Sequence, residues 1–373
     1  MNPSVQGTEL IHAFEKWCPP HLAYEWDNVG LNVGTLNKPV RNVMITLDVM
    51  ENVVDEAIEN QVDLIVAHHP VIFKPLSQIH SNDPKGRVIT KLLKHDISVY
   101  TAHTNLDIVE GGVNDAMAHA LQLEQLESLV ETHREELIKL VVFVPEDYAD
   151  TVRDAISQAG AGHIGDYSHC TFQSGGEGTF KPLEGTNPFI GNQGEIEKAA
   201  EKRVETIVPK HKLSDVLQAM EASHPYEEAA YDVYPLKNQG KLHGIGRVGV
   251  LEEPVTLETF CSQVKTAFDV PALRVTGSLD DMVKRVAVLG GSGEKFIDAA
   301  QSKDADVYVT GDMTLHPAQD AWAMGLNVVD PGHHVEKLMK RSVQSFFNDT
   351  FNHEAKQVHI MISEAPTEPF QFV

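Results

Sequence analysis

Polar residues suited to metal binding or proton transfer follow several apolar runs of this sequence. Two histidines end the run DLIVAHHP, and the segments AHTNLD and DPGHHVE follow two further runs. Histidine and carboxylate without cysteine form a ligand set that suits zinc, manganese or iron(II). The candidates are His68, His69, His103, Asp107, Asp312, His316, His333, His334 and Glu336.

Each of these motifs also has a simpler explanation, which the residues alone leave open. Leu64, Ile65 and Val66 predict a strand covered on both faces, so the histidine pair could simply hydrogen-bond to the core. His333 and Glu336 are three residues apart and would project to one face at the start of a helix, but this spacing is common. With 19 histidines in the chain, position must decide which of them matter.

The elements that must position these residues alternate between strand and helix. In the first third we predict strands at 40–48, 62–69 and 97–107, with helices at 51–61 and 86–96. In the last third we predict strands at 284–290, 306–312 and 326–336, with helices at 294–305 and 316–325. Such alternation indicates βαβ units and a parallel sheet, where ligands collect at the carboxyl ends of the strands.

The two outer thirds share a register. Val43 corresponds to Val286 and Leu64 to Val307, with the same offset of 243 residues in both cases. On this register His68 and His69 match Gly311 and Asp312, so both thirds place polar residues at equivalent strand ends. We therefore predict an α/β fold in which two similar βαβ-type halves, residues 1–130 and 241–373, form one metal-site domain.

The middle of the chain, residues 131–240, has a different pattern. Segments 136–160 and 202–236 each predict strand and helix, and a glycine-rich stretch at 160–180 between them predicts a hairpin region. This βαβ–βαβ order predicts an inserted α+β domain of the ferredoxin-like kind.

Composition excludes several classes of function. A hydrophobic content of 42% with 23% charged residues is that of an ordinary globular protein, and no apolar run reaches the length of a membrane span. The first residues do not resemble a signal peptide, and three distant cysteines suit a reducing compartment, so we expect a cytoplasmic protein. A net charge of −24 makes nucleic-acid or membrane binding improbable, but a bound cation can still attract a small anionic substrate.

The motifs EWDNVGLNVG, AHHP, AHTNLD and GHHVE, in this order, closely resemble the dinuclear-metal family of NGG-one-interacting factor three proteins. Some members of that family carry the name GTP cyclohydrolase 1 type 2. The resemblance implies two divalent metal ions per chain, with zinc expected first and iron or manganese as alternatives. The ligands it implies are His68, His69, Asp107, His333 and Glu336, with His334 as an alternative to His333.

The same resemblance implies a toroidal homohexamer whose metal sites face an internal cavity. The middle section resembles the P-II/CutA-like domain of longer bacterial members, and HPYEEAAYDV is its clearest motif. We expect no ligand to come from this section, which would instead control access to the cavity or only add contacts between subunits.

The expected function is metal-dependent hydrolysis of a nucleotide or related small substrate. Asp312, His316 and His103 are the candidates for proton transfer, although Asp312 and His316 would serve equally well as hydrogen-bond partners of ligands. If Asp107 bridges the ions, its removal should cost at least one metal ion and any hydrolytic activity. The alternative is a non-catalytic hexamer that responds to a metal or a nucleotide. LGGSGEKF is either an anion-binding turn or a plain tight turn, and Asp27 and Asn28 either support the site or form a turn.

Overall fold

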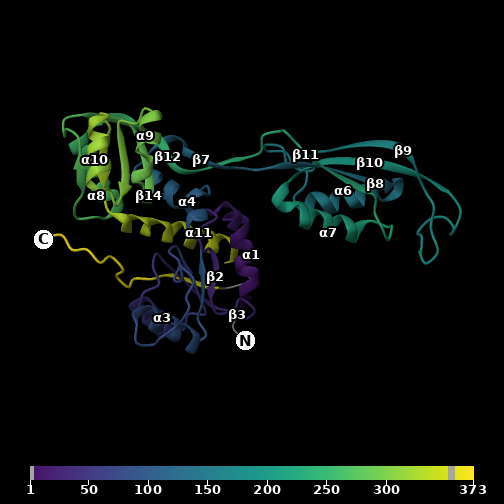
Figure 1. The fold of residues 1–373 in the computed structure, drawn as a ribbon, viewed down its shortest axis with the longest axis horizontal. Helices are drawn as coiled ribbons and strands as arrows, with labels where there is room; N and C mark the ends of the chain where they lie inside the picture. The colour runs from purple at the N-terminus through teal and green to yellow at the C-terminus, as the bar shows by residue number, and fades with distance from the viewer. Residues whose placement is uncertain (1–3, 352–357) are drawn as a thin grey trace. The chain divides into compact units, whose positions relative to one another are not determined.

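The computed structural model describes residues 4–351 and 358–373 and has a mixed α/β fold with several sheets (Figure 1). The chain divides into two compact units. The outer unit consists of Met1–His133 and His243–Val373, and the middle unit consists of Arg134–Leu242. No helix within the described ranges is both long and apolar enough to cross a membrane.

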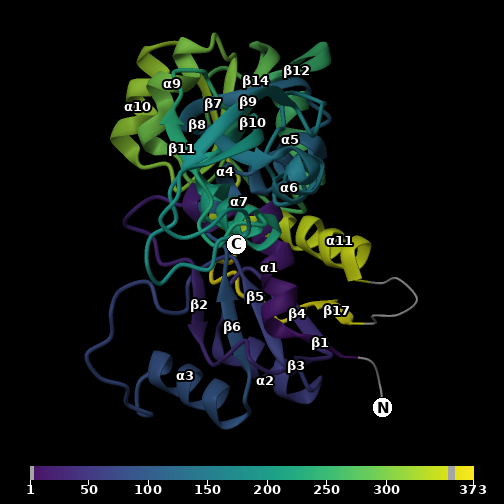
Figure 2. The same cartoon turned by 90° about the vertical axis from the view of Figure 1, so that its right-hand side faces the viewer.

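A five-stranded sheet in the outer unit carries the first group of candidate residues (Figure 2). Its order is β17 (His359–Ile362), β4 (Asn42–Thr46), β5 (Leu64–Ala67), β6 (Ser98–Thr101) and β2 (Gly30–Val33). All neighbours are parallel except β2, which runs antiparallel to β6. The helices that accompany the sheet are α1 (Gly7–Trp17), α2 (Glu51–Glu59), α3 (Pro84–Lys94) and α11 (Met339–Phe351).

The three central strands of this sheet, β4, β5 and β6, are buried on both faces because their residues alternate between two cores. Val43 and Ile45 pack in one cluster with Phe14 of α1 and Phe347 of α11. Met44 lies in the other, which includes residues of α2 and α3. Every residue of β5 is buried, as its continuous apolar run predicts.

A six-stranded sheet in the same unit carries the second group of candidates. Its order is β13 (Arg274–Thr276), β16 (Asn327–Asp330), β15 (Val307–Gly311), β14 (Met282–Ser292), β12 (Leu242–Thr256) and β7 (Glu124–Arg134). Strands β14, β15 and β16 are parallel, whereas β12 runs antiparallel to β14 and β13 runs antiparallel to β16. Its helices are α8 (Leu257–Phe268), α9 (Ile297–Ser302) and α10 (Leu315–Ala323).

The strand pairing of the two sheets has the same register. Val43 of β4 lies opposite Leu64 of β5, and Val286 of β14 lies opposite Val307 of β15. These are the four residues that an offset of 243 relates in the sequence. In each sheet the third strand, β6 or β16, pairs in parallel with the second strand, on the side away from the first.

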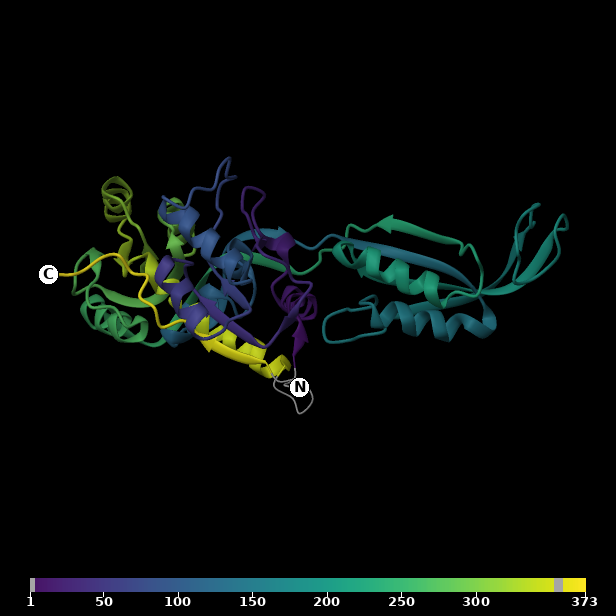
Figure 3. The same ribbon diagram turned by 90° about the horizontal axis from the view of Figure 1, so that it is seen from below.

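The middle unit is built on a separate four-stranded sheet. Its elements are β8 (Leu137–Pro145), η2 (Glu146–Tyr148), α6 (Ala149–Gln158), β9 (Thr171–Phe180), β10 (Glu197–Pro209), η3 (Lys210–Lys212), α7 (Leu213–Ser223) and β11 (Tyr231–Pro235). The sheet order is β11-β8-β10-β9, with every pair antiparallel. Helices α6 and α7 cover one face (Figure 3), and Val152 and Met220 from these helices are fully buried with Leu140 and Val204 of the strands.

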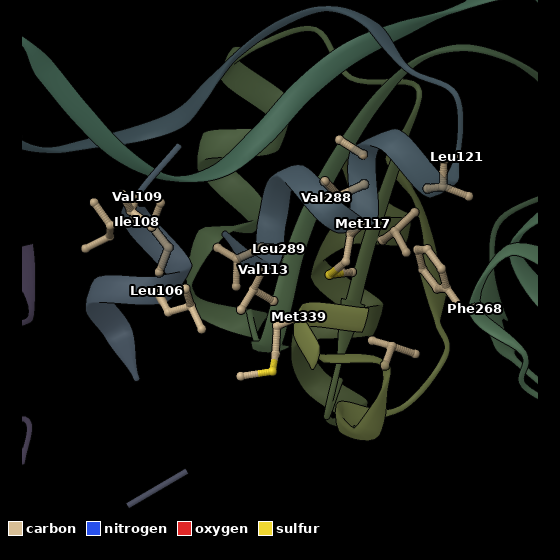
Figure 4. Close-up of a cluster of buried hydrophobic side chains, with 14 of the residues drawn as sticks. Leu106, Ile108, Val109, Val113, Met117, Leu121, Phe268, Val288, Leu289 and Met339 are labelled. Atoms are coloured by element: carbon tan, nitrogen blue, oxygen red, sulfur yellow. The ribbon is translucent and has the colours of Figure 1, made fainter. Parts of the chain in front are cut away.

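Two short helices join the first half of the outer unit to the six-stranded sheet. Leu106 of α4 (Thr104–Ile108) and Val113 and Met117 of α5 (Val113–Ala120) are fully buried in one core with Val288 and Leu289 of β14 (Figure 4). This core fixes α4, which carries Asp107. The remaining short elements are η1 (Pro20–Leu22), β1 (Val5–Gln6), β3 (Pro39–Val40), η4 (Glu294–Phe296) and η5 (His333–Leu338).

A buried ion pair reinforces this junction. Arg247 of β12 donates from Nε to Oδ1 of Asp115 at 2.8 Å and from Nη2 to Oδ2 at 2.6 Å. Both side chains are only 8% exposed. The guanidinium also donates to the carbonyls of Gly244 and Gly246 and, at longer range, of Ile108 and Val109. The charge is therefore surrounded by acceptors, which is what burial of a guanidinium requires.

Candidate metal centre

The candidate residues lie at the carboxyl ends of parallel strands from both sheets. His68 and His69 follow β5 directly, His103 follows β6, and Asp107 lies on α4, because the strand predicted at 97–107 ends at Thr101. His333 and Glu336 lie in η5, a 3₁₀ helix that follows β16. In a 3₁₀ helix residues three apart eclipse each other, which brings His333 Nε2 to 3.1 Å from Glu336 Oε2.

Glu336 lies at the centre of the cluster. Its side chain is 3% exposed, and its Oε2 is 3.0 Å from His69 Nε2 and 3.8 Å from His68 Nε2. Asp107 Oδ1 lies 3.5 Å from His68 Nε2 on the other side. Of the three groups of described residues that could hold a metal ion, one contains histidines alone, His68–His69–His103, and two contain a carboxylate, His68–Asp107–Glu336 and His69–His333–Glu336. Glu336 is common to both, so the geometry favours Glu336, and not Asp107, as the carboxylate shared between two ions.

Two buried atoms of the cluster have no hydrogen-bond partner. His68 donates from Nδ1 to the carbonyl of Ala102 at 2.9 Å, which leaves the lone pair of Nε2 free. Neither His68 Nε2 nor Asp107 Oδ1 has a hydrogen-bond partner among the described residues. Leaving such atoms buried and unpaired costs free energy, whereas a cation between them would satisfy both. The residues present therefore fit a divalent metal.

Three histidines of the cluster have a carboxylate beside the Nδ1 atom of the ring, and this contact orients the ring. A carboxylate held against one nitrogen fixes the tautomer and ring angle of a metal-binding histidine, and the opposite nitrogen is then free for the metal. The pairs, measured from Nδ1 to the nearer carboxylate oxygen, are His69–Asp48 at 2.7 Å, His103–Asp27 at 2.8 Å and His333–Asp312 at 2.6 Å.

The electrostatics of the cluster favour a positive charge. Burial opposes the charged imidazolium of His69, yet hydrogen bonds to Asp48 and Glu336 raise the pKa of His69 to about 10. The hydrogen bond to Glu336 raises the pKa of His333 to about 9 despite burial. Burial and the neighbouring Glu336 raise the pKa of Asp107 well above its ordinary value. Without metal, protons thus occupy positions where a cation would bind.

The structure separates the remaining candidates. Asp312 Oδ2 lies 2.6 Å from His333 Nδ1, a geometry that favours the hydrogen-bonding role over proton transfer. His316 lies exposed on α10 with its Nδ1 3.2 Å from Gln319 Oε1, and it belongs to none of the three possible metal-binding groups found in the described residues. His103 belongs to one of them, with His68 and His69. His334 Nε2 is 2.9 Å from Thr367 Oγ1, so the geometry favours His333 as the ligand.

Sequence reasoning missed Asp48, the partner of His69. It stands two residues after β4 and so at the same sheet edge as the histidines, which is the signal that could have found it. The Asp27 carboxylate accepts from Asn28 N at 2.8 Å, as in a turn, but it also accepts from Thr104 N at 3.0 Å and contacts His103, a geometry that favours support of the site.

The glycine turn of LGGSGEKF makes room for the cluster. Gly291 has a φ of +66°, and a Cβ at this position would come within 2.7 Å of Glu336 Oε1 and 3.4 Å of His333 Nε2. Gly290 N donates to Asn114 Oδ1 at 2.9 Å, so it is not free to bind an anion. With the Glu336 carboxylate beside it, the turn suits close packing of this site better than phosphate binding.

Exposed aromatic rings lie beside His103. Trp26 is 60% exposed and Phe73 is 42% exposed, and their ring centroids are 6.2 and 6.3 Å from that of His103. The two rings are 6.0 Å from each other. Large exposed aromatic residues next to a polar cluster mark a surface that can bind a ligand.

Comparison with known proteins gives full-length matches. The family model described as Duf34/NIF3 (NGG1p interacting factor 3) matches residues 5–369. A Bacillus subtilis protein named GTP cyclohydrolase 1 type 2 homolog is 53% identical over 373 residues, with all of both chains covered. The crystal structure of a Bacillus cereus protein related to NIF3 has a TM-score of 0.90 at 52% identity, and that of a Staphylococcus aureus protein has 0.78 at 31%, each covering both chains completely.

Proposed function

Because the chain belongs to the Duf34/NIF3 family, we propose that it is a two-metal hydrolase acting on a nucleotide or a related small substrate. The observation that carries this proposal is the pair of buried, unpartnered atoms, His68 Nε2 and Asp107 Oδ1, beside a carboxylate common to two triads. The first ion would be held by His68, Asp107 and Glu336, and the second by His69, His333 and Glu336. Zinc suits this ligand set, as do iron and manganese.

Two divalent ions held close together supply a water of lowered pKa and offset developing negative charge. The chain's own residues would do the rest. Asp48 and Asp312 would keep His69 and His333 in the tautomer that leaves Nε2 free. His103, which Asp27 orients through Nδ1, is the proposed proton-transfer group because it belongs to one group with His68 and His69.

The exposed rings of Trp26 and Phe73 favour a substrate with a flat ring system. A heterocyclic base could stack on these rings while the rest of the molecule reaches the cluster. This is the feature of the site that supports a nucleotide-like substrate.

Metal content tests the site. Asp107→Ala should lose at least one ion per chain in elemental analysis, since it removes a ligand of one triad, and it should leave the fold intact. His12→Ala, on α1, should keep the full metal content. A metal content in Asp107→Ala equal to that of the unmodified protein would remove Asp107 from the ligand set.

Turnover tests the hydrolase. Metal-loaded protein should hydrolyse at least one of a panel of nucleoside triphosphates, phosphodiesters and cyclic amides. His103→Gln should lower that rate without changing metal content. Full metal loading with no turnover across the panel would favour the alternative, a metal- or nucleotide-responsive regulatory protein.

We also propose a division of labour along the chain. Residues 1–130 and 241–373 would be two duplicated halves of one metal domain, which the shared pairing register supports. Residues 131–240 would be an inserted ferredoxin-like domain, which the strand order β11-β8-β10-β9 supports. The assembly we propose is a toroidal homohexamer in the cytoplasm, and its mass in solution tests that proposal.

A further inference from the structure

A cavity of about 480 Å³ lies within the middle unit, and the proposed hydrolase does not use it. Its size is that of a small-molecule site. The cavity lies between the segment that follows β9 and the HPYEE motif before β11. Its lining includes Phe180, Phe189, Glu201, Tyr226, Glu227 and Glu228.

The HPYEE motif is held in one conformation by its histidine. His224 is buried, its Nδ1 accepts from Tyr226 N at 3.1 Å, and its Nε2 donates to the carbonyl of Phe143 at 3.0 Å. Only one neutral tautomer makes both hydrogen bonds, and burial lowers the pKa of His224 in agreement with that neutral form. The histidine therefore acts as a fixed support that directs Tyr226 and the two glutamates after it.

Aromatic rings form one wall of the cavity. The ring of Tyr226 lies 5.7 Å from that of Phe180 and 6.2 Å from that of Phe189. Faces of such rings attract a cation within about 6 Å of the centroid.

The negative charge of the cavity comes from glutamate side chains. Glu201 Oε1 accepts from the hydroxyl of Tyr226 at 3.1 Å, and Glu227 accepts from Asn187 N at 3.1 Å. Both partners are neutral, so neither carboxylate is offset by them. Nearby lysines pair elsewhere: Lys202 contacts Glu146 at 2.6 Å and Lys198 contacts Glu177 at 2.7 Å.

Gly178 makes space for the Glu201 carboxylate. A Cβ at Gly178 would lie 2.1 Å from Glu201 Oε2, so any other residue there would displace it. The lining thus contains three glutamates against one lysine, together with aromatic rings.

We infer that this cavity is a binding site for a small organic cation, a quaternary or protonated amine carried on a flat or compact apolar body. Tyr226, Phe180 and Phe189 would contact the cationic head through their rings. Glu201, with Glu227 and Glu228, would supply the countercharge. The inference concerns the middle unit alone and stands whether or not the metal centre is catalytic.

Calorimetric titration of the full chain with benzyltrimethylammonium chloride tests it, with neutral benzyl alcohol as the matched ligand. We expect the cation to bind at least about tenfold more tightly than the alcohol, because only the cation gains the charge and ring contacts. Equal affinities for the two, or no measurable heat with the cation, would overturn the inference.

Variants locate the binding. Glu201→Gln keeps the shape but removes the charge, and Tyr226→Leu removes a ring; each should weaken cation binding about tenfold while metal content stays unchanged. Gly178→Ala leaves every charge in place but displaces the Glu201 carboxylate, so it should weaken binding as well. Glu177→Gln, whose carboxylate pairs with Lys198 outside the cavity, should bind like the unmodified chain. Unchanged affinity in the folded Glu201→Gln and Gly178→Ala variants would overturn the assignment.

Discussion

Removal of the Asp115 carboxylate should destabilise the outer unit strongly. The substitution Asp115→Ala leaves the guanidinium of Arg247 in place, 8% exposed and without its bidentate partner. It also deprives Gly111 N of an acceptor that lies at 2.9 Å. This pair joins α5 to β12, so the loss falls on the junction that fixes α4 and Asp107.

The expected loss is about 3 kcal/mol in the free energy of unfolding. Breaking a buried ion pair by removing one partner costs about 3–5 kcal/mol, because an uncompensated charge stays buried. Arg247 keeps the backbone carbonyls of Gly244 and Gly246 at 2.9 and 2.8 Å, which places the loss at the lower end of that range.

Tryptophan fluorescence isolates the unit concerned. The chain has 3 tryptophans, Trp17, Trp26 and Trp322, and all of them lie in the outer unit. Urea unfolding followed by their emission, with chelator present and protein concentration fixed, therefore reports this unit without the middle one. If the free energy of unfolding falls by about 3 kcal/mol per molar urea, the midpoint of the unfolding transition should move down by about 1 M urea.

An exposed ion pair in the same unit provides the control. Asp55 lies 2.6 Å from Lys91 with 51% of its side chain exposed, and Asp55→Ala should cost about 0.5 kcal/mol or less. If Asp115→Ala shifted the transition no more than Asp55→Ala does, the ion pair would not stabilise this junction and the reasoning from its burial would be wrong.

Three further outcomes are expected. Metal binding at neutral pH should release protons and strengthen as pH rises toward 9, because the pKa values of His69 and His333 are raised to about 10 and about 9. Identical calorimetric enthalpies of metal binding in two buffers of different ionisation heat would contradict this. Gly291→Val should lower metal content at least severalfold in a folded protein, because the valine Cβ would press on Glu336. Elemental analysis measures the metal content, and full loading of the variant would show that the space beside Glu336 is not needed for metal binding. Replacement of residues 134–242 by a Gly/Ser linker should leave metal content unchanged, since the proposed ligands all lie in the outer unit; loss of metal from a folded variant would contradict that.

The strands that carry the site could be predicted because their patterns are local. Continuous apolar runs mark β5 and β15, and the polar residues directly after such runs fall at one sheet edge. The offset that relates Val43 to Val286 also predicts the register that both sheets have.

Other features depend on long-range contacts that no local pattern records. Arg247 and Asp115 are 132 residues apart, and nothing near either residue indicates the other. Strand β7, with the sequence EQLESLVETHR, is largely polar and becomes a strand by pairing at the edge of a sheet. The choice of Glu336 over Asp107 as the shared carboxylate required the positions of individual oxygen atoms.

The placement of β17 has a consequence for synthesis of the chain on the ribosome. This strand, at residues 359–362, pairs in parallel with β4, at residues 42–46, so the last strand to be synthesised completes the first sheet. Until then β4 is an unpaired edge of mostly apolar residues, the kind of edge that recruits other chains. Nascent chains that stall before residue 359 should therefore aggregate or need a chaperone, even though all five proposed metal ligands have already been made.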